Sequence, residues 1–301
     1  MRHYLRVLTI GRQSTVGITE KEFYELQQAK GVLANFYSLT ENYRVVVESY
    51  RTVEKAKHDA ELDQILYSKF GYDDFSDARV ALNSPIVGYL ASSRYFIDST
   101  DKILPEILSP AQVESFSKFC SNIYDSICEY RFVEALRNYV QHRELPVHTI
   151  TYHNYVEDMN NIKTSDKVTS LSLRATRQTL QNDKKFKKAA LKGMPEAIDI
   201  IYCIRFHMEG IWKMHDYLLQ SHFEIADNAR AIVLSAIAQF EKNTGEKSFG
   251  LHAVAQKTEN EVSEKIPLFL DYDDARRTAL KRIGNLNNLH KRYVTGKIQK
   301  A

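Results

Sequence analysis

The stretch from Thr19 to Ser68 contains no proline and only one glycine, Gly31. Proline and glycine are the residues that most often interrupt helices, so a long stretch almost without them restricts the chain to extended helical segments. Apolar residues recur in it at roughly helical spacing: Leu26, Val32, Leu33, Phe36, Val46, Val47, Tyr50, Val53, Leu62 and Ile65. The pattern predicts one very long helix or a broken pair.

The whole chain is poor in helix-breaking residues, with 11 glycines and 6 prolines among 301 residues. Hydrophobic residues make up 44% and charged residues 26%, a composition that supports a sizeable core. The sequence shows neither the apolar run of a signal peptide nor a membrane span of roughly 18 apolar residues. The 3 cysteines lack a CxxC spacing and are expected to be reduced thiols. We therefore expect a cytoplasmic protein that does not enter a membrane.

Two further helices are predicted in the first half of the chain. One should begin after Gly71 and extend to about Leu104, with a capping residue among Asp73, Asp74 and Ser76. Ser109 and Pro110 should start the next one, as cap and first helical residue, and it should run to about Arg143. Its apolar residues step by three or four: Val113, Phe116, Cys120, Ile123, Ile127, Tyr130, Val133, Leu136 and Val140. This seam is typical of a helical bundle.

The pattern changes after Pro146. The segments 146–156 (PVHTITYHNYV) and 167–175 (KVTSLSLRA) are rich in strand-forming residues and are separated by a polar stretch, which predicts a β-hairpin. Helical patterns return over about 195–221 and 224–243, and a last one begins at Asp271. Residues 1–18 indicate a short strand followed by a loop.

These patterns together predict a mainly α fold, a helical bundle with long helices and a β-hairpin insertion after the helix that ends near His142. We expect three parts: an amino-terminal helical extension (1–75), a helical core (76–245) with the hairpin insert at about 146–190, and a basic, helical carboxy-terminal extension (246–301).

The segment from Glu134 to His148 contains the residues that most suggest chemistry. Pro146 disfavours helical geometry before it, so the helix should end close to His142. At about 100° per residue, Asn138 and His142 share a face that points away from the apolar seam, while Arg137 lies at the edge of that seam. One surface would therefore present an imidazole, an amide and a guanidinium.

Such a set is suited to acid–base chemistry on a phosphate. The unpaired carbonyl groups at a helix end favour an imidazolium at His142, and the like charge of Arg143 opposes it. An arginine can hold a phosphate and stabilise developing negative charge. Because one helix supplies only one histidine, a two-fold dimer would be needed to provide both a base and an acid. The alternative is a solvated helix end without a catalytic role.

The motif Arg137-Asn138-x-x-x-His142 resembles the Rx(4–6)H motif of the HEPN superfamily, in the form with a polar residue after the arginine. HEPN domains are helical bundles, commonly dimeric, and many are metal-independent endoribonucleases of toxin–antitoxin, abortive-infection and CRISPR-linked defence systems. The resemblance implies that Arg137 and His142 are catalytic and that Asn138 supports them. Glu144 stands where HEPN toxins silenced by nucleotidylation have a tyrosine.

Basic residues elsewhere are candidates for contacts with the RNA backbone, which the net charge of +3 permits without demanding it. These candidates are Arg143, His148, Lys184, Lys185, Lys187, Lys188, Lys291 and Arg292. Three histidines on one predicted helix, His207, His215 and His222, are more typical of hydrogen bonding between helices than of a metal site. The acidic residues of 271–274 (DYDD) should cap a helix.

The sequence therefore predicts a homodimeric endoribonuclease that needs no metal or cofactor and acts as a toxin or phage-defence effector, with an antitoxin or defence protein as a further partner. Two alternatives stay open. One is a non-catalytic module that binds RNA or nucleotides. The other is a helical interaction protein, such as a scaffold or antitoxin-like subunit, in which the motif face is a protein interface.

Overall fold

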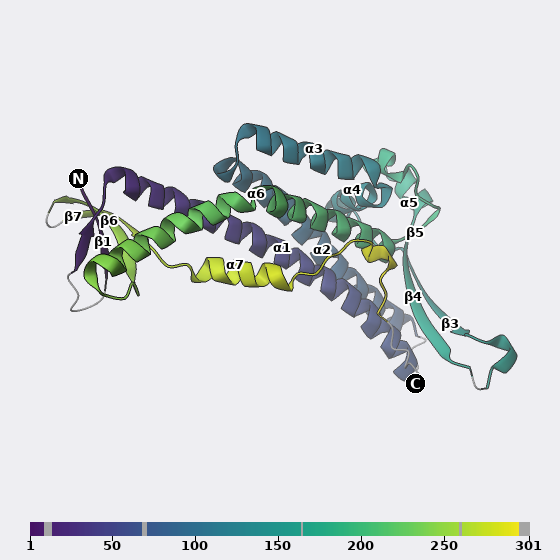
Figure 1. Ribbon diagram of the computed structural model, residues 1–301. Coiled ribbons are helices and arrows are strands. Elements are labelled where there is room, and N and C mark those ends of the chain that lie inside the picture. Colours follow the sequence, from purple (N-terminus) through teal and green to yellow (C-terminus); the bar gives the residue numbers. More distant parts are fainter. Residues whose placement is uncertain (9–13, 68–70, 164, 259–260, 295–301) are drawn as a thin grey trace. The chain divides into compact units, whose positions relative to one another are not determined.

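The computed structural model describes residues 1–8, 14–67, 71–163, 165–258 and 261–294, and these residues form a mainly helical protein with two small antiparallel sheets (Figure 1). The helices are α1 (Glu20–Leu66), α2 (Tyr72–Ile107), α3 (Pro110–Ser126), α4 (Cys128–His142), α5 (Arg177–Asn182), α6 (Ile200–Thr244) and α7 (Asp271–Arg282). The strands are β1 (Arg2–Val7), β2 (Thr15–Gly17), β3 (Thr149–Val156), β4 (Lys167–Thr176), β5 (Ala197–Asp199), β6 (Leu251–Thr258) and β7 (Glu261–Pro267).

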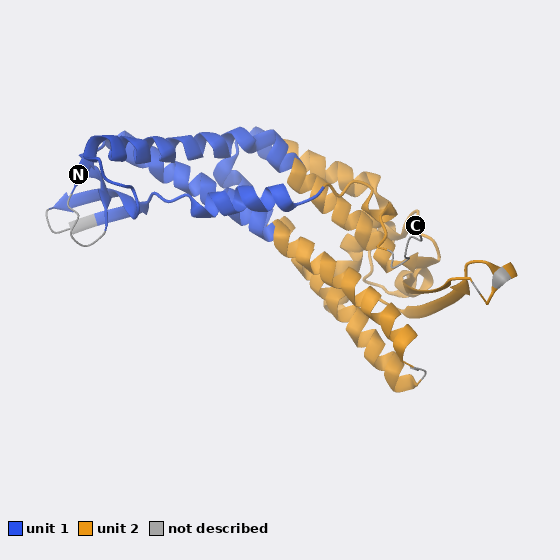
Figure 2. Cartoon of the chain, turned by 60° about the horizontal axis from the view of Figure 1, so that its bottom comes forward, with its two compact units in different colours: residues 1–42, 99–113, 217–284 blue, residues 43–98, 114–216, 285–301 orange. Residues whose placement is uncertain are grey.

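The chain forms two compact units, each assembled from three separate segments (Figure 2). Unit 1 contains residues 1–42, 99–113 and 217–284, and unit 2 contains residues 43–98, 114–216 and 285–301. The division differs from the three consecutive parts expected from the sequence. The physical reason is the length of α1, α2 and α6, since each of these helices contributes residues to both units.

Unit 1 combines helical segments with the four-stranded sheet β2-β1-β6-β7. The strand expected in residues 1–18 is present as β1, which pairs with β6 in the register Tyr4↔Val254. The strands β6 and β7 were not expected, because residues 246–301 were predicted to be a helical extension. They are short, and the buried strand β6 (LHAVAQKT) has apolar runs that periodicity alone does not separate from helix.

Unit 2 holds the second sheet, of order β3-β4-β5. The β-hairpin predicted between Pro146 and residue 190 is confirmed, with β3 and β4 paired in the register Tyr152↔Leu171. Strand β5 adds to the other edge of β4 and was missed, because a strand of three residues carries no detectable alternation.

Side-chain hydrogen bonds cap the starts of two helices, and one of these caps is at the predicted Ser109. Thr19 donates its backbone N–H to Glu22 Oε2 at 2.6 Å, and its hydroxyl accepts from the backbone N–H of Glu22 at 3.1 Å. Ser109 donates its backbone N–H to the side chain of Gln112 at 2.9 Å at the start of α3. The first pair forms a complete capping box, and the second forms the half in which the side chain at the third helical position accepts from the backbone of the cap residue. Downstream of its cap, α1 is a single helix rather than a broken pair.

Two helix boundaries differ from the sequence prediction. The helix expected from Ser109 to Arg143 is divided, because Ile127 adopts an extended conformation (φ −113°, ψ 106°) between α3 and α4. Helix α4 also buries residues outside the predicted seam, namely Phe132, Ala135 and Tyr139. The two helices expected over 195–243 form the one helix α6, with a kink at His222 (φ −136°, ψ 15°) where they were predicted to meet.

The prediction that the acidic residues of 271–274 cap a helix is wrong for Asp273. The cap position of α7 is Leu270, without a side-chain cap hydrogen bond. Asp273 is fully buried and accepts hydrogen bonds from three arginines instead: Arg230 (2.6 Å), Arg276 (2.7 Å) and Arg277 (3.0 Å). These contacts join α7 to α6 inside unit 1, and paired charges of this kind are the condition for burying a carboxylate.

Candidate functional site

Helix α4 carries the motif residues and lies within unit 2. Its apolar face is buried through residues such as Leu136 and Tyr139, while Asn138 and His142 are exposed and Arg137 is half-buried. This is the outward face that the helical wheel predicts. The long side chain of Arg137 lies at the boundary, where its stem can be covered and its charge can reach solvent.

His142 is the last residue of α4, and Arg143 leaves the helical conformation (φ −137°, ψ −89°). Arg143 forms an ion pair with Asp183, with Nε 3.5 Å from Oδ2. The imidazole of His142 is therefore presented at an open helix end. Such a position leaves it accessible to a substrate from solvent.

Nη1 of Arg137 donates a hydrogen bond to Oε1 of Gln141 at 3.2 Å, one turn further along the helix. Its Nε is buried and has no hydrogen-bond partner in the described part of the chain. Glu134 lies one turn earlier on the same helix, at the i, i+3 spacing of neighbouring side chains. The guanidinium is therefore hydrogen-bonded to Gln141, while Glu134 acts on it only as a nearby charge on the same helix.

Glu134 belongs to a chain of polar groups from three helices, in which Glu134 is half-buried and His207 and Tyr89 are fully buried. Its Oε1 lies 3.0 Å from Nε2 of His207 on α6, and Nδ1 of His207 lies 2.8 Å from the hydroxyl of Tyr89 on α2. His207 is fully buried, and the ring of Tyr130 stacks on it at 4.5 Å. Burial raises the pKa of the Glu134 carboxyl, but the contact with His207 and the charges of Arg137 and Arg94 outweigh it, so this pKa is lowered overall.

Gly210 on α6 makes the stacking of Tyr130 possible. A side-chain Cβ at this position would lie 2.5 Å from Cδ2 and 2.7 Å from Cε2 of the Tyr130 ring. Carbon atoms in contact normally lie about 3.5–4.0 Å apart. Only glycine therefore allows the backbone of α6 to approach α4 closely enough for Tyr130 to cover His207.

The lysine-rich segment that follows α5 is attached to α4. Phe186 is buried against Phe132 at 6.3 Å and Tyr139 at 5.8 Å between ring centres, and both of these residues belong to α4. Four exposed lysines of the predicted RNA-contact set surround this anchor: Lys184, Lys185, Lys187 and Lys188. The structure therefore places these cations beside the helix that carries the motif, although they lie more than forty positions along the sequence.

Other members of the predicted set have different surroundings. Nδ1 of His148 accepts a hydrogen bond from the backbone N–H of Thr176 at 3.0 Å, at the base of the hairpin, and burial lowers the pKa of this histidine. Lys291 and Arg292 are exposed in a segment that contacts α6, where the ring of His290 stacks on Phe206 at 3.9 Å. Within the described residues, this segment contacts α6 rather than α4.

The three histidines of α6 do not share one environment. His207 makes hydrogen bonds between helices, as expected from the sequence, whereas the ring of His215 stacks on Tyr43 at 3.9 Å. His222 lies at the kink and belongs to unit 1. Among the described residues, no cluster of three or more histidine, cysteine or acidic side chains has the arrangement of a metal site.

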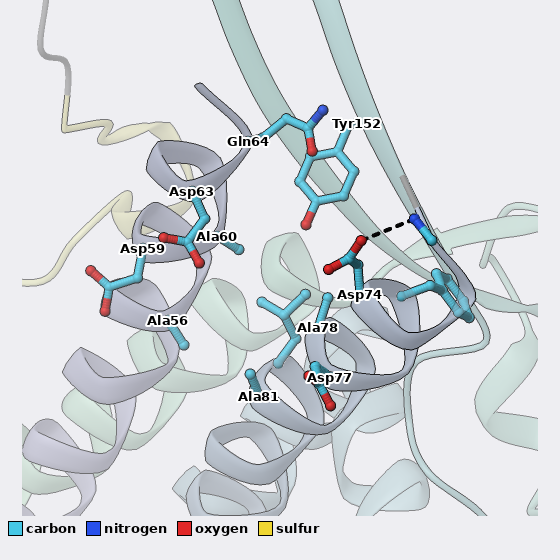
Figure 3. A pocket seen from close by; sticks show the side chains of 13 residues that line it. Ala56, Asp59, Ala60, Asp63, Gln64, Asp74, Asp77, Ala78, Ala81 and Tyr152 are labelled. Atoms are coloured by element: carbon cyan, nitrogen blue, oxygen red, sulfur yellow. Dashed lines mark hydrogen bonds between the residues drawn. The ribbon is translucent and has the colours of Figure 1, made fainter. Parts of the chain in front are cut away.

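Unit 2 also contains an acidic cavity of about 610 Å³ that the sequence did not indicate. Asp59, Asp63 and Gln64 of α1 line it together with Asp74 of α2 and Tyr152 of β3 (Figure 3). Asp74 is engaged at the start of α2, where it accepts from the backbone N–H of Gly71 at 2.9 Å. The carboxylates that line this cavity would repel the phosphates of a nucleic acid, so the cavity is unsuited to binding a nucleic-acid backbone.

Sequence reasoning identified the exposed motif but missed the residues behind it. Glu134 was noted only as the start of the motif segment, and Tyr89 and Arg94 were not singled out. They lie on α2, about forty residues before Glu134 in the sequence, and nothing in either segment reveals the pairing. Only the packing of α2, α4 and α6 brings these groups together.

Comparison with models of protein families, with curated proteins and with solved structures finds no match for this chain. No helix in the described ranges has the length and apolar character needed to cross a membrane.

Proposed function

We propose that this protein is an endoribonuclease that cleaves RNA without metal, through Arg137, Asn138 and His142. One observation carries the proposal: the end of α4 presents the imidazole and the amide on an exposed face, with the half-buried guanidinium at its edge. The resemblance of these residues to the HEPN motif supports the same reaction.

The proposed reaction is an internal transfer at phosphorus. A histidine takes the proton of the 2′-hydroxyl, the 2′-oxygen forms a bond to phosphorus, and the bond from phosphorus to the 5′-oxygen breaks. An imidazolium returns a proton to the leaving 5′-oxygen. Arg137 stabilises the negative charge of the transition state, and Asn138 orients the phosphate. The products are a 2′,3′-cyclic phosphate and a 5′-hydroxyl.

The reaction uses a base and an acid, whereas α4 ends with one histidine. We therefore propose a two-fold dimer in which two copies of the motif face form one composite cleft. The exposed lysines at 184, 185, 187 and 188 support RNA binding, because they are fixed beside α4 by Phe186. Arg143, His148, Lys291 and Arg292 are proposed as weaker contacts. A role in toxin action or phage defence, in the cytoplasm and with a neutralising or defence-system partner, rests on the resemblance alone.

The test is cleavage of mixed RNA in the presence of EDTA by wild-type protein, Arg137→Ala and His142→Ala. His153→Ala is a matched control, because it removes an exposed imidazole from β3 rather than from α4. We expect both motif variants to lose at least about a hundredfold in rate, since an acid–base group such as His142 contributes about 10²–10⁴-fold and a charge-stabilising donor such as Arg137 about 10²–10³-fold. The control should keep its activity.

An inactive wild type, or equal activity in all four proteins, would contradict the proposal. RNA binding that survives both motif substitutions in an inactive wild type would favour the non-catalytic module. The dimer is tested separately with His142→Cys, because two thiols in one cleft should form a disulfide between chains on mild oxidation. If the His142→Cys protein forms no disulfide between chains, the proposed composite cleft is wrong.

A further inference from the structure

Strand β3 forms one edge of the three-stranded sheet in unit 2, with β4 on one side and no strand of the described residues on the other. The edge is long, because β3 pairs with β4 over 8 residues without a shift in register. A strand edge presents backbone N–H and C=O groups that can pair with a further strand, so proteins usually protect it with charges, proline, bulges or a covering segment.

The sequence of β3 (TITYHNYV) contains none of these protecting residues, since it lacks lysine, arginine, aspartate, glutamate and proline. Strand β7 (EVSEKIP), an edge of the other sheet, shows the usual protection: it carries Glu264, Lys265 and Pro267 and pairs with β6 through register shifts. The remaining edge strands, β2 and β5, have only 3 residues each. In the described part of the chain, β3 is therefore the edge that is both long and chemically unprotected.

The backbone groups of β3 alternate between β4 and the outer edge. Glu157, the residue after β3, donates its N–H to the carbonyl of Asp166 on the opposite side of the hairpin at 3.1 Å. In an antiparallel ladder, such hydrogen-bonded pairs alternate with pairs that are not bonded to each other. The backbone groups of Ile150, Asn154 and Val156 therefore point away from β4.

We propose that β3 is a self-association surface, which pairs antiparallel with β3 of a second copy of this chain across a two-fold axis. The surface differs from the motif face of α4, and the proposal does not depend on RNA cleavage. The alignment that pairs Ile150 with Val156 of the second copy is centred on His153, and it places Tyr155 opposite Thr151. Aromatic and β-branched residues in opposite positions stabilise antiparallel pairs of strands.

The charge pattern favours a second copy in this orientation. Like charges in opposite positions destabilise a pair of strands, and β3 has no acidic side chain, lysine or arginine to oppose its own copy. The acidic residues Glu157 and Asp158 follow β3 at one end only. A parallel arrangement would bring the two acidic ends together, whereas the antiparallel one separates them by the length of the strand, about 25 Å.

The pairing is also large enough for a specific interface. A strand of this length that pairs along all its residues makes about eight backbone hydrogen bonds. A typical interface between proteins carries about ten direct hydrogen bonds. Tyr155, which is 53% exposed in the single chain, adds an aromatic side chain from each copy.

The first experiment measures the dissociation constant of the dimer by sedimentation equilibrium for wild type, Asn154→Pro and Asn154→Ala. Proline removes the outward N–H of residue 154 and leaves the ladder with β4 intact, because proline is tolerated on an edge strand where its nitrogen faces solvent. Asn154→Ala is the matched control, since both variants lose the hydrogen bond that Asn154 accepts from Thr169 at 2.8 Å. We expect dimers of wild type and Asn154→Ala, and a dissociation constant at least about tenfold higher for Asn154→Pro, which leaves two carbonyl groups of the dimer unpaired.

The second experiment tests the alignment with His153→Cys. In the proposed dimer the two copies of residue 153 form a pair without mutual backbone hydrogen bonds, and the Cα atoms of such a pair lie about 4.5 Å apart. This distance is within the range of a disulfide. His153→Cys should therefore form a disulfide between chains on mild oxidation. The matched control is Lys265→Cys, which places an exposed thiol on the charged edge strand β7 and should form none.

Three results would overturn the proposal: a monomeric wild type, equal dissociation constants for Asn154→Pro and Asn154→Ala, or a His153→Cys protein without a disulfide between chains. If circular dichroism shows that Asn154→Pro is unfolded, His153→Glu takes its place with His153→Gln as control. Two carboxylates facing each other across the axis should raise the dissociation constant about two- to fivefold, and equal constants would overturn the proposal. None of these measurements uses RNA, so their outcome is distinct from that of the cleavage assay.

Discussion

The replacement of Gly210 by alanine tests the packing that supports the candidate site. The new methyl group would lie 2.5 Å and 2.7 Å from two ring carbons of Tyr130. Tyr130 is 2% exposed and stacked on His207, so its ring has no free space to move into. Overpacking of this kind costs about 1–3 kcal/mol.

Alanine also favours the helix over glycine by about 1 kcal/mol, and this gain opposes the clash. The net expectation for Gly210→Ala is a loss of up to about 2 kcal/mol in the free energy of unfolding. Gly88 provides the matched control, because it lies in a helix of the same unit and nothing surrounds its Cβ position within 4 Å. Gly88→Ala should be stabilising by up to about 1 kcal/mol. Both variants gain the same helix propensity, so the difference between their free energies of unfolding reflects the clash alone and should be about 1–3 kcal/mol.

Urea unfolding followed by circular dichroism measures both free energies of unfolding. A cycle with Tyr130→Leu isolates the cause, because the smaller side chain makes room for the methyl group and should recover at least about 1 kcal/mol of the loss. Two results would refute the close approach of α6 to Tyr130. One is an equal change in the free energy of unfolding for Gly210→Ala and Gly88→Ala. The other is a cycle in which Gly210→Ala has the same effect with and without Tyr130→Leu.

Two further predictions concern buried charge. Asp273→Asn should lower the free energy of unfolding by about 3–5 kcal/mol, measured by urea unfolding, because three arginines lose their shared carboxylate. Burial raises the pKa of the Asp273 carboxyl, but the arginines outweigh this and lower it, so the stabilisation should persist above the pKa of the unfolded chain and disappear as pH falls through the folded value. Burial lowers the pKa of His215 to about 3, so the unfolded chain binds a proton below about pH 6.5 that the folded chain does not. His215→Phe should therefore flatten the fall in stability between pH 6 and pH 5 by up to about 1.4 kcal/mol per pH unit, and an unchanged slope would show that His215 is protonated when folded.

The sequence predicted the helical architecture well where a single local signal decides the outcome. The absence of breakers from Thr19 onward predicted α1, and the alternating segments near Tyr152 and Leu171 predicted the β3–β4 hairpin. It failed where the decision is not local. No glycine or proline marks the break at Ile127 or lies within strand β6. The conformation of each segment depends instead on how it packs against other parts of its own unit.

For the candidate site, the spacing of residues along the chain shows which groups are available at the end of α4 and which of them face outward. Helix periodicity fixes the direction of a side chain, so the exposure of Asn138 and His142 and the boundary position of Arg137 follow from spacing alone. The tertiary structure alone decided what lies behind them. Glu134, His207 and Tyr89 come from three helices far apart in the chain, and a hydrogen bond between such residues depends on how the helices pack rather than on any local pattern.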